Sequence, residues 1–269
     1  NQVLEKFSDG VKATAAKNGG LFVDQFHPYL TVLDKARAAG PKYDRITAGD
    51  AVHPGPPGQA LMAASILKGL GFPRFVSSVE IDAATSKVVA AKNCQPTNVA
   101  AKDGGVAFDR LDAALPFFPP EAESILRWAP LLEELNDYGL KVTGLKAGKY
   151  EIRLGGKKVA EHSADDLARG VNLAAPVLAA GPVADPGKAV KAAIEAKNRF
   201  HHDRIFRGVV LAGLSAPDWL DLKITPAEIE TQRQAAYKSR MAKMPELDAE
   251  VRKSLEMKSH RVEIVPAAN

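Results

Sequence analysis

Several features that would place the chain in a special class are absent. Among its 269 residues there is a single cysteine, Cys94, so no internal disulfide can form and cysteine usage says nothing about the redox compartment. No apolar run approaches the roughly 18 residues that a membrane-spanning helix needs. The sequence also has no internal repeat and no low-complexity tract. Together these absences exclude a disulfide-stapled scaffold, a membrane span and a repeat array.

The chain also lacks a strong local excess of charge. Lys and Arg number 36 against 32 Asp and Glu, which leaves a net charge of +4, and the two signs nearly balance in each of the segments 1–73, 74–225 and 226–269. Binding to a phosphate backbone requires a concentrated basic face, so the sequence argues against a nucleic-acid partner. The hydrophobic content of 46% is that of an ordinary globular protein of one or two domains.

The N-terminal end has neither a methionine nor a signal-peptide pattern. It opens within an amphipathic helix predicted over 2–17, in which Val3, Leu4, Phe7 and Val11 recur at helical spacing. We therefore expect these residues to belong to a longer polypeptide. The compartment stays open, with a secreted or periplasmic location as one option, because any export signal would precede Asn1.

Residues 1–73 alternate between helix and strand. Short buried strands are predicted at 21–23 and 43–47, and helices at 2–17, 29–39 and 58–70. Such alternation is typical of a parallel sheet covered by helices on both faces. Two strands are too few for that sheet, so we expect further strands upstream of Asn1.

The remaining sequence changes character twice. Residues 74–176 are predicted to form a β-rich accessory region with one helix near 121–136. Residues 177–269 are predicted to form a helical region that opens with a linker at 176–186. A short edge strand is expected at 261–266. The other predicted strands lie at 75–82, 87–91, 99–108, 140–142, 150–154 and 158–159, and the other helices at 187–211, 226–243 and 246–258.

The loop Asp50-Ala-Val-His53 is the strongest candidate for catalysis. Histidine is the usual general base near neutral pH, provided that an acceptor holds its Nδ1–H and leaves Nε2 free. A carboxylate three residues earlier can bend back to that nitrogen. The loop also follows a predicted parallel strand, at the end of the sheet where open α/β sheets bind ligands.

The same spacing occurs a second time, in Asp24-Gln-Phe-His27, and both histidines precede a proline. Only His53 is followed at once by a predicted helix, which favours the second copy as the catalytic pair. For Asp24 and His27 a structural role in a loop or a pocket wall is the competing interpretation.

Residues 48–71, which read Ala-Gly-Asp-Ala-Val-His-Pro-Gly-Pro-Pro-Gly-Gln-Ala-Leu-Met-Ala-Ala-Ser-Ile-Leu-Lys-Gly-Leu-Gly, resemble the last conserved block of SGNH (GDSL-type) hydrolases. The resemblance implies that Asp50 is the orienting acid and His53 the general base. In that family the nucleophile is a serine in an N-terminal Gly-Asp-Ser block, and a glycine and an asparagine from intervening blocks help to form the oxyanion hole.

The resemblance covers about 1–73, and no Gly-Asp-Ser occurs in the 269 residues. We therefore expect the serine and the oxyanion-hole residues to lie outside this sequence. The implied fold class is α/β, with part of a flavodoxin-like (SGNH) three-layer sheet over 1–73. The β-rich region 74–176 and the helical region 177–269 resemble the long C-terminal extensions of some bacterial members.

Four other residues carry a hydroxyl or thiol that could replace the missing serine. Ser65 is expected to point away from His53, and Ser77 and Ser78 lie on a predicted strand without the sharp turn that exposes a nucleophile. Solvated or hydrogen-bonded hydroxyls are the simpler interpretation of all three. Cys94 is expected to be a passive thiol.

The sequence thus predicts an ester hydrolase that uses a Ser-His-Asp mechanism. It implies no metal and no organic cofactor, and the resemblance makes acetyl esters of carbohydrates plausible substrates among small-molecule or carbohydrate esters. The alternative is a non-catalytic protein that binds glycans or serves as a scaffold. Which ester is cleaved and the oligomeric state stay open.

Overall fold

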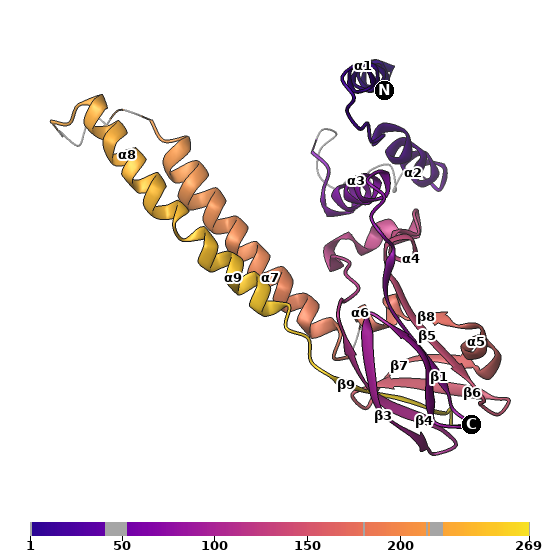
Figure 1. Cartoon of the computed structure of the whole chain (residues 1–269). Coiled ribbons are helices and arrows are strands. Elements are labelled where there is room, and N and C mark those ends of the chain that lie inside the picture. The colour runs from indigo at the N-terminus through magenta and orange to yellow at the C-terminus, as the bar shows by residue number, and fades with distance from the viewer. Residues whose placement is uncertain (1, 41–52, 180, 214, 216–222, 269) are drawn as a thin grey trace. The chain divides into compact units, whose positions relative to one another are not determined.

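The chain folds as a mixed α/β protein with two β-sheets and several helices (Figure 1). The structure is a computed structural model and describes residues 2–40, 53–179, 181–213, 215 and 223–268. It divides into two compact units. The first unit comprises Asn1–Gly181 and Ser259–Asn269, and the second comprises Pro182–Lys258.

The N-terminal part of the first unit is helical, with α1 (Gln2–Lys17), α2 (Phe26–Ala38) and α3 (Pro56–Gly69). All three helices were predicted within a few residues. The strand expected at 21–23 is wrong, because residues 21–25 have no regular structure and Leu21 is 69% exposed. A three-residue segment forms a strand only where a neighbouring strand pairs with it, and no described residue does so here.

The predicted strand at 43–47 lies outside the described residues. The flavodoxin-like sheet therefore stays a prediction, whereas the coarser class, a mixed α/β fold, is confirmed.

One sheet of the first unit has the strand order β2-β1-β5-β8. It contains β1 (Phe75–Asp82), β2 (Lys87–Lys92), β5 (Asp137–Thr143) and β8 (Val171–Asn172). The strands predicted at 75–82 and 87–91 are present, and they pair as the antiparallel β1–β2 hairpin. Strand β5, predicted at 140–142, pairs in parallel with β1.

The other sheet has the order β3-β4-β9-β6-β7. It contains β3 (Cys94–Lys102), β4 (Gly105–Asp112), β6 (Lys149–Leu154), β7 (Lys157–Ser163) and β9 (His260–Pro266). The edge position expected for 261–266 is wrong, since β9 lies between β4 and β6. This segment therefore belongs to the β-rich unit and not to the helical region in which the sequence placed it.

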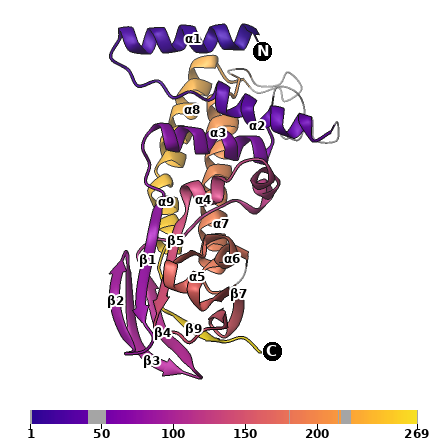
Figure 2. The same ribbon diagram turned by 90° about the vertical axis from the view of Figure 1, so that its right-hand side faces the viewer.

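The two sheets face each other and share a core. The chain passes from the first sheet to the second at Asn93. This residue has a positive φ of 55°, and its side-chain amide donates a hydrogen bond to the carbonyl of Val76. The inner faces bury the alternate residues that the pattern predicts, among them Ile81, Phe108 and Leu140. The strands form one body with α2, α3 and α4 at one end of it (Figure 2).

Between β4 and β5 the single helix expected near 121–136 is split. Residues Pro120–Arg127 form the 3-10 segment η2, and Leu131–Leu135 form α4. Pro130 separates the two segments, because proline cannot donate the backbone hydrogen bond that a continuous helix needs. The linker expected at 176–186 is also shorter than predicted, since α6 (Ala174–Ala179) fills its start, after α5 (Ala164–Arg169) and β8.

The second unit is helical. It contains α7 (Ala184–Phe200), which continues as the π-helical segment η3 (His201–Val210), then α8 (Pro226–Met241) and α9 (Met244–Ser254). Pro226 at the first helical position and the Met244-Pro245 break mark the boundaries that the sequence indicated. None of the described helices is both long and apolar enough to cross a membrane.

Candidate active site

His53 lies at the start of a well-anchored helix. It is exposed, and the chain after it enters α3 through Gly55, the N-cap residue, and two prolines at the first helical positions. The side-chain amide of Gln59 donates to the carbonyl of Pro54 at 2.9 Å and so fixes the segment that follows the imidazole. Asp50, the predicted orienting acid, lies outside the described residues.

Helix α3 is anchored by a hydrophobic cluster. Leu61 and Ala64 are almost fully buried, and they belong to one cluster with side chains from α2, η2 and α4. The other buried members are Val32, Ala36, Ile125, Ala129 and Leu131. Helix α3 therefore holds the chain that follows His53 in place.

The Asp24–His27 pair forms a direct contact. Asp24 Oδ2 lies 2.7 Å from Nδ1 of His27, and Asp24 Oδ1 accepts the backbone N–H groups of Phe26 and His27 at 3.0 and 3.1 Å. The carboxylate thus caps the first turn of α2 and holds the imidazole with its second oxygen. This is the structural role that the sequence left as the competing interpretation, and it shows that Asp-x-x-His-Pro spacing can bring a carboxylate to Nδ1.

The charges of this pair stabilise each other. Burial alone would raise the pKa of Asp24, but hydrogen bonds from the amide and imidazole of His27 outweigh it and lower that pKa below its ordinary value. The hydrogen bond to Asp24 raises the pKa of His27. On its other side, His27 Nε2 lies 3.8 Å from Oε1 of Glu5. A carboxylate, and not a hydroxyl, therefore faces the nitrogen that would have to accept a proton.

Three of the residues considered as substitute nucleophiles are hydrogen-bonded elsewhere. Ser65 donates to the carbonyl of Leu61 within α3 at 3.0 Å. Ser77 is fully buried between the sheets. Cys94 donates to the carbonyl of Ser78 at 3.1 Å, and burial raises the pKa of its thiol, so the passive role predicted for it fits.

A buried polar network that the sequence analysis missed links the two sheets. Asp112 Oδ1 accepts from Arg110 Nε at 2.8 Å and from Ser77 Oγ at 2.7 Å, and Asp112 Oδ2 accepts from the Tyr138 hydroxyl at 2.6 Å. Arg110 also donates to Ser77 Oγ at 2.6 Å and stacks over the Tyr138 ring at 3.9 Å. Burial raises the pKa of Tyr138 well above its usual value, so its hydroxyl stays a donor.

This network is inaccessible, because each of its four side chains is at most 4% exposed. Its members come from β1, β4 and β5, and the one sequence signal is a pair of opposite charges two positions apart on the buried face of β4, where the other side chains, Val106 and Phe108, are apolar. The arrangement positions the sheets and offers no room for a substrate.

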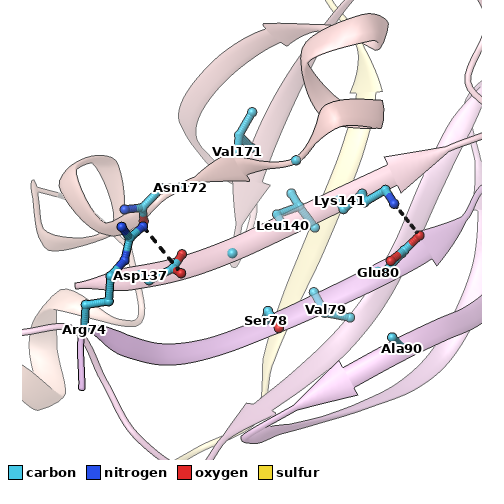
Figure 3. Close-up of a pocket in the computed structure, with 12 residues that line it drawn as sticks. Arg74, Ser78, Val79, Glu80, Ala90, Asp137, Leu140, Lys141, Val171 and Asn172 are labelled. Carbon is cyan, nitrogen blue, oxygen red and sulfur yellow. Dashed lines mark ion pairs between the residues drawn. The ribbon is translucent and has the colours of Figure 1, made fainter. Parts of the chain in front are cut away.

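A shallow trough of about 420 Å³ crosses the outer face of the β2-β1-β5-β8 sheet (Figure 3). An ion pair stands at each end, Arg74–Asp137 at 3.6 Å and Lys141–Glu80 at 2.8 Å. Ser78 lies between them (Figure 3), and its hydroxyl has no hydrogen-bond partner within the described part of the chain. The trough offers charged and hydroxyl groups but contains no aromatic platform.

Comparison with solved structures shows a likeness of fold. No family model matches the chain, and no curated protein matches it. Among solved structures, the chain is similar to BT4096, described as a gut microbial diltiazem-metabolizing enzyme, with a TM-score of 0.75 and 21% sequence identity. The match covers 99% of this chain and 67% of that chain. At this identity the likeness shows a shared fold, which includes both the β-rich and the helical parts.

Proposed function

We propose that the chain belongs to an ester hydrolase of the SGNH type, in which Asp50 orients His53 and the nucleophilic serine comes from residues outside these 269. The observation that carries the proposal is the Asp24–His27 contact. It demonstrates in this chain that a carboxylate three residues before a His-Pro pair reaches Nδ1 at 2.7 Å. Asp50 and His53 repeat that spacing, and His53 is exposed at the start of an anchored helix.

The mechanism follows from those roles. Nε2 of His53 takes the proton of the serine hydroxyl as the oxygen attacks the ester carbonyl, and the proton then goes to the departing alcohol. Water next attacks the acyl-enzyme, with His53 again taking and returning the proton. Asp50 holds the imidazole in the required tautomer and stabilises its charged form.

The fold likeness is compatible with this proposal. BT4096 is named as a diltiazem-metabolizing enzyme, and diltiazem itself contains an acetate ester, the class of bond proposed here. Acetyl esters of carbohydrates are the second substrate class to test, on the strength of the SGNH resemblance. No step of the mechanism calls for a metal or an organic cofactor.

The test compares two histidines with the same local spacing. Hydrolysis of p-nitrophenyl acetate, diltiazem and acetylated xylan is measured for the full-length polypeptide, for His53→Ala and for the matched control His27→Ala. We expect His53→Ala to lower kcat/KM by about 10⁴-fold or more and His27→Ala to leave it within a few-fold. Asp50→Asn should lower kcat by about 10³- to 10⁴-fold.

The missing nucleophile is tested separately. The 269 residues alone should show negligible ester turnover and no labelling by a fluorophosphonate, whereas the full-length polypeptide should be labelled on one serine. His53-dependent hydrolysis by the 269 residues alone would contradict the proposed origin of the serine. Equal activity of wild type and His53→Ala in the full-length polypeptide would refute the esterase proposal itself.

A second candidate is a glycan-binding or scaffold protein, which the trough in Figure 3 favours because its ion pairs and the Ser78 hydroxyl suit sugar hydroxyl groups. Glycan-array binding that Ser78→Val abolishes, together with no ester turnover by the full-length polypeptide, would support this candidate over the first.

A further inference from the structure

Exposed apolar side chains gather in the helical N-terminal part of the first unit. Among the described residues, 19 large apolar side chains are exposed, and nine of them lie within 2–72. The described residues of the longer β-rich part of the same unit expose three, Val88, Val89 and Phe117. The nine are Val3, Leu4, Phe7, Val11, Leu21, Met62, Ile66, Leu70 and Phe72. Apolar exposure that is concentrated in this way marks a surface that another segment or molecule covers.

Helix α3 is apolar on two opposite sides. Leu61 and Ala64 lie on the side that packs in the cluster with α2, η2 and α4. Met62 and Ile66, four positions apart, lie on the other side, where they are 36% and 38% exposed. A helix that is apolar all round is normally buried all round. The second side of α3 therefore lacks a complete cover among the described residues.

A short apolar segment lies along this second side. Val23 contacts α3 at Gly69, since a Cβ at that glycine would lie 2.5 Å from Cγ1 of Val23. Gly69 follows Met62 by seven positions and so lies on the same side of the helix. Residues 21–23 have no regular structure, and none of their backbone groups forms a hydrogen bond within the described part of the chain. Such free backbone groups beside apolar side chains form an edge on which another strand can pair.

We propose that a β-sheet formed by residues of the same polypeptide outside these 269 covers the second side of α3 and pairs with residues 21–23. We call this surface the open α3 face, defined by Leu21, Val23, Met62 and Ile66. The proposal rests on the proposed function in one respect, because it too takes these residues as part of a longer polypeptide. The fold likeness supports that step, since about a third of the BT4096 chain lies outside the part that matches.

A segment of the same polypeptide fits this face better than a second copy of the chain. A stable dimer buries about 800 Å² on each partner, which four apolar side chains and a three-residue edge do not supply. A covalently connected strand needs less area, because its docking does not immobilise a separate molecule. Strands on this face also lie beside the helix that directly follows His53, toward which the serine of the proposed function must be brought.

The first experiment follows the oxidation of methionine by hydrogen peroxide. The 269 residues contain four methionines, of which Met62 lies on the open α3 face and Met241, Met244 and Met257 lie in the helical unit. The full-length polypeptide and the 269 residues alone are treated in parallel, and peptide mass spectrometry gives a rate for each methionine. The three methionines of the helical unit are internal controls, because no part of the open α3 face belongs to that unit.

We expect the oxidation of Met62 to be at least about tenfold slower in the full-length polypeptide, because the sheet shields its sulfur. The rates of the three control methionines should agree between the two polypeptides within about twofold.

Hydrogen exchange tests the pairing itself. Alternate residues of a strand donate to one neighbour, so at least one amide of residues 21–23 should exchange about 10²-fold or more slowly in the full-length polypeptide than in the 269 residues alone.

A substitution on the face tests its burial. Ile66→Asp should lower the urea midpoint of the full-length polypeptide by about 1 M or more, because it places a carboxylate under the sheet. The matched control is Ile194→Asp, since the side chain of Ile194 is also helical and is 39% exposed. It should change the midpoint by less than about 0.3 M.

Three results would overturn the proposal. Equal oxidation of Met62 in both polypeptides would show that nothing covers the face. Protection of Met62 in the 269 residues alone that grows with protein concentration would assign the face to a second copy. Protection of Met62 without slower exchange at residues 21–23 would exclude a paired strand.

None of these measurements depends on ester hydrolysis. A full-length polypeptide that is inactive but has a shielded Met62 would refute the esterase proposal and support this one. An active esterase with an exposed Met62 would do the reverse.

Discussion

Removal of Arg110 tests how the buried network stabilises the two facing sheets. In Arg110→Met the carboxylate of Asp112 keeps its hydrogen bonds from Ser77 and Tyr138 but loses the only cation in contact with it among the described residues. Asp112 is 4% exposed, so water cannot replace the guanidinium. Leaving one charge of a buried pair unpaired costs about 3–5 kcal/mol.

The same reasoning predicts that the two charges are coupled. Asp112→Leu alone leaves the guanidinium of Arg110 unpaired and should cost a similar free energy. The double variant Arg110→Met/Asp112→Leu removes both charges and should be destabilised by several kcal/mol less than the sum of the single variants. Tyr138→Phe removes one hydrogen bond to a charged group and should cost about 1.5–3 kcal/mol.

The assay is urea denaturation at neutral pH, followed by far-UV circular dichroism and by the fluorescence of Trp128, which packs in the first unit. A coupling free energy near zero would refute the argument, since it would mean that each charge is solvated without the other. Equal stability of Arg110→Met and wild type would refute it as well.

Three further predictions concern local structure. Gly105→Ala should destabilise the first unit by about 3 kcal/mol in urea denaturation, because a Cβ there would lie 1.9 Å from the carbonyl oxygen of Ile264. Ser163→Ala should cost about 1 kcal/mol in the same assay, since it removes the capping box of α5. His27→Ala should lower the melting temperature most between about pH 4 and 6.5. The raised pKa of His27 gives stability that is lost as pH rises through it, and the lowered pKa of Asp24 gives stability that is lost as pH falls through it. A loss that is the same at all pH values would contradict the charge pairing.

Local patterns predicted local structure well. The boundaries of α8 and α9 follow from Pro226 and the Met244-Pro245 break, and the β1–β2 hairpin follows from alternation around a short turn. Sheet membership could not be predicted in this way. The pairing of β5 with β1 depends on which strands meet in space, and the pattern of either strand alone does not contain that information.

The position of β9 shows why an interior strand was mistaken for an edge strand. The alternation of polar and apolar residues over 261–266 predicted a short edge strand with one solvated face. In the structure Arg261 pairs with Asp109 of β4 at 3.2 Å, so one charge of β9 is satisfied across the sheet. Charged residues on one face of a strand therefore do not tell an edge strand from an interior strand whose outer face is solvated.

For the candidate site, the sequence indicated the Asp-x-x-His spacing and the residue types, but it did not indicate which side chains contact one another. It correctly left a structural role open for Asp24 and His27, and it expected hydrogen-bonded hydroxyls at Ser65 and Ser77, as observed. The buried network was missed because Ser77, Asp112 and Tyr138 come together only when both sheets form.

The central place of β9 in its sheet has a consequence for synthesis and degradation. Asp109 and Arg261, which contact each other across β4 and β9, are 152 positions apart. A nascent or cleaved chain that ends anywhere within the helical unit holds two separate hairpins, each with a row of unsatisfied backbone groups where β9 should lie. Open strands of this kind associate with other chains. We therefore expect a chain that is truncated within the helical unit to aggregate and not to form a smaller folded protein.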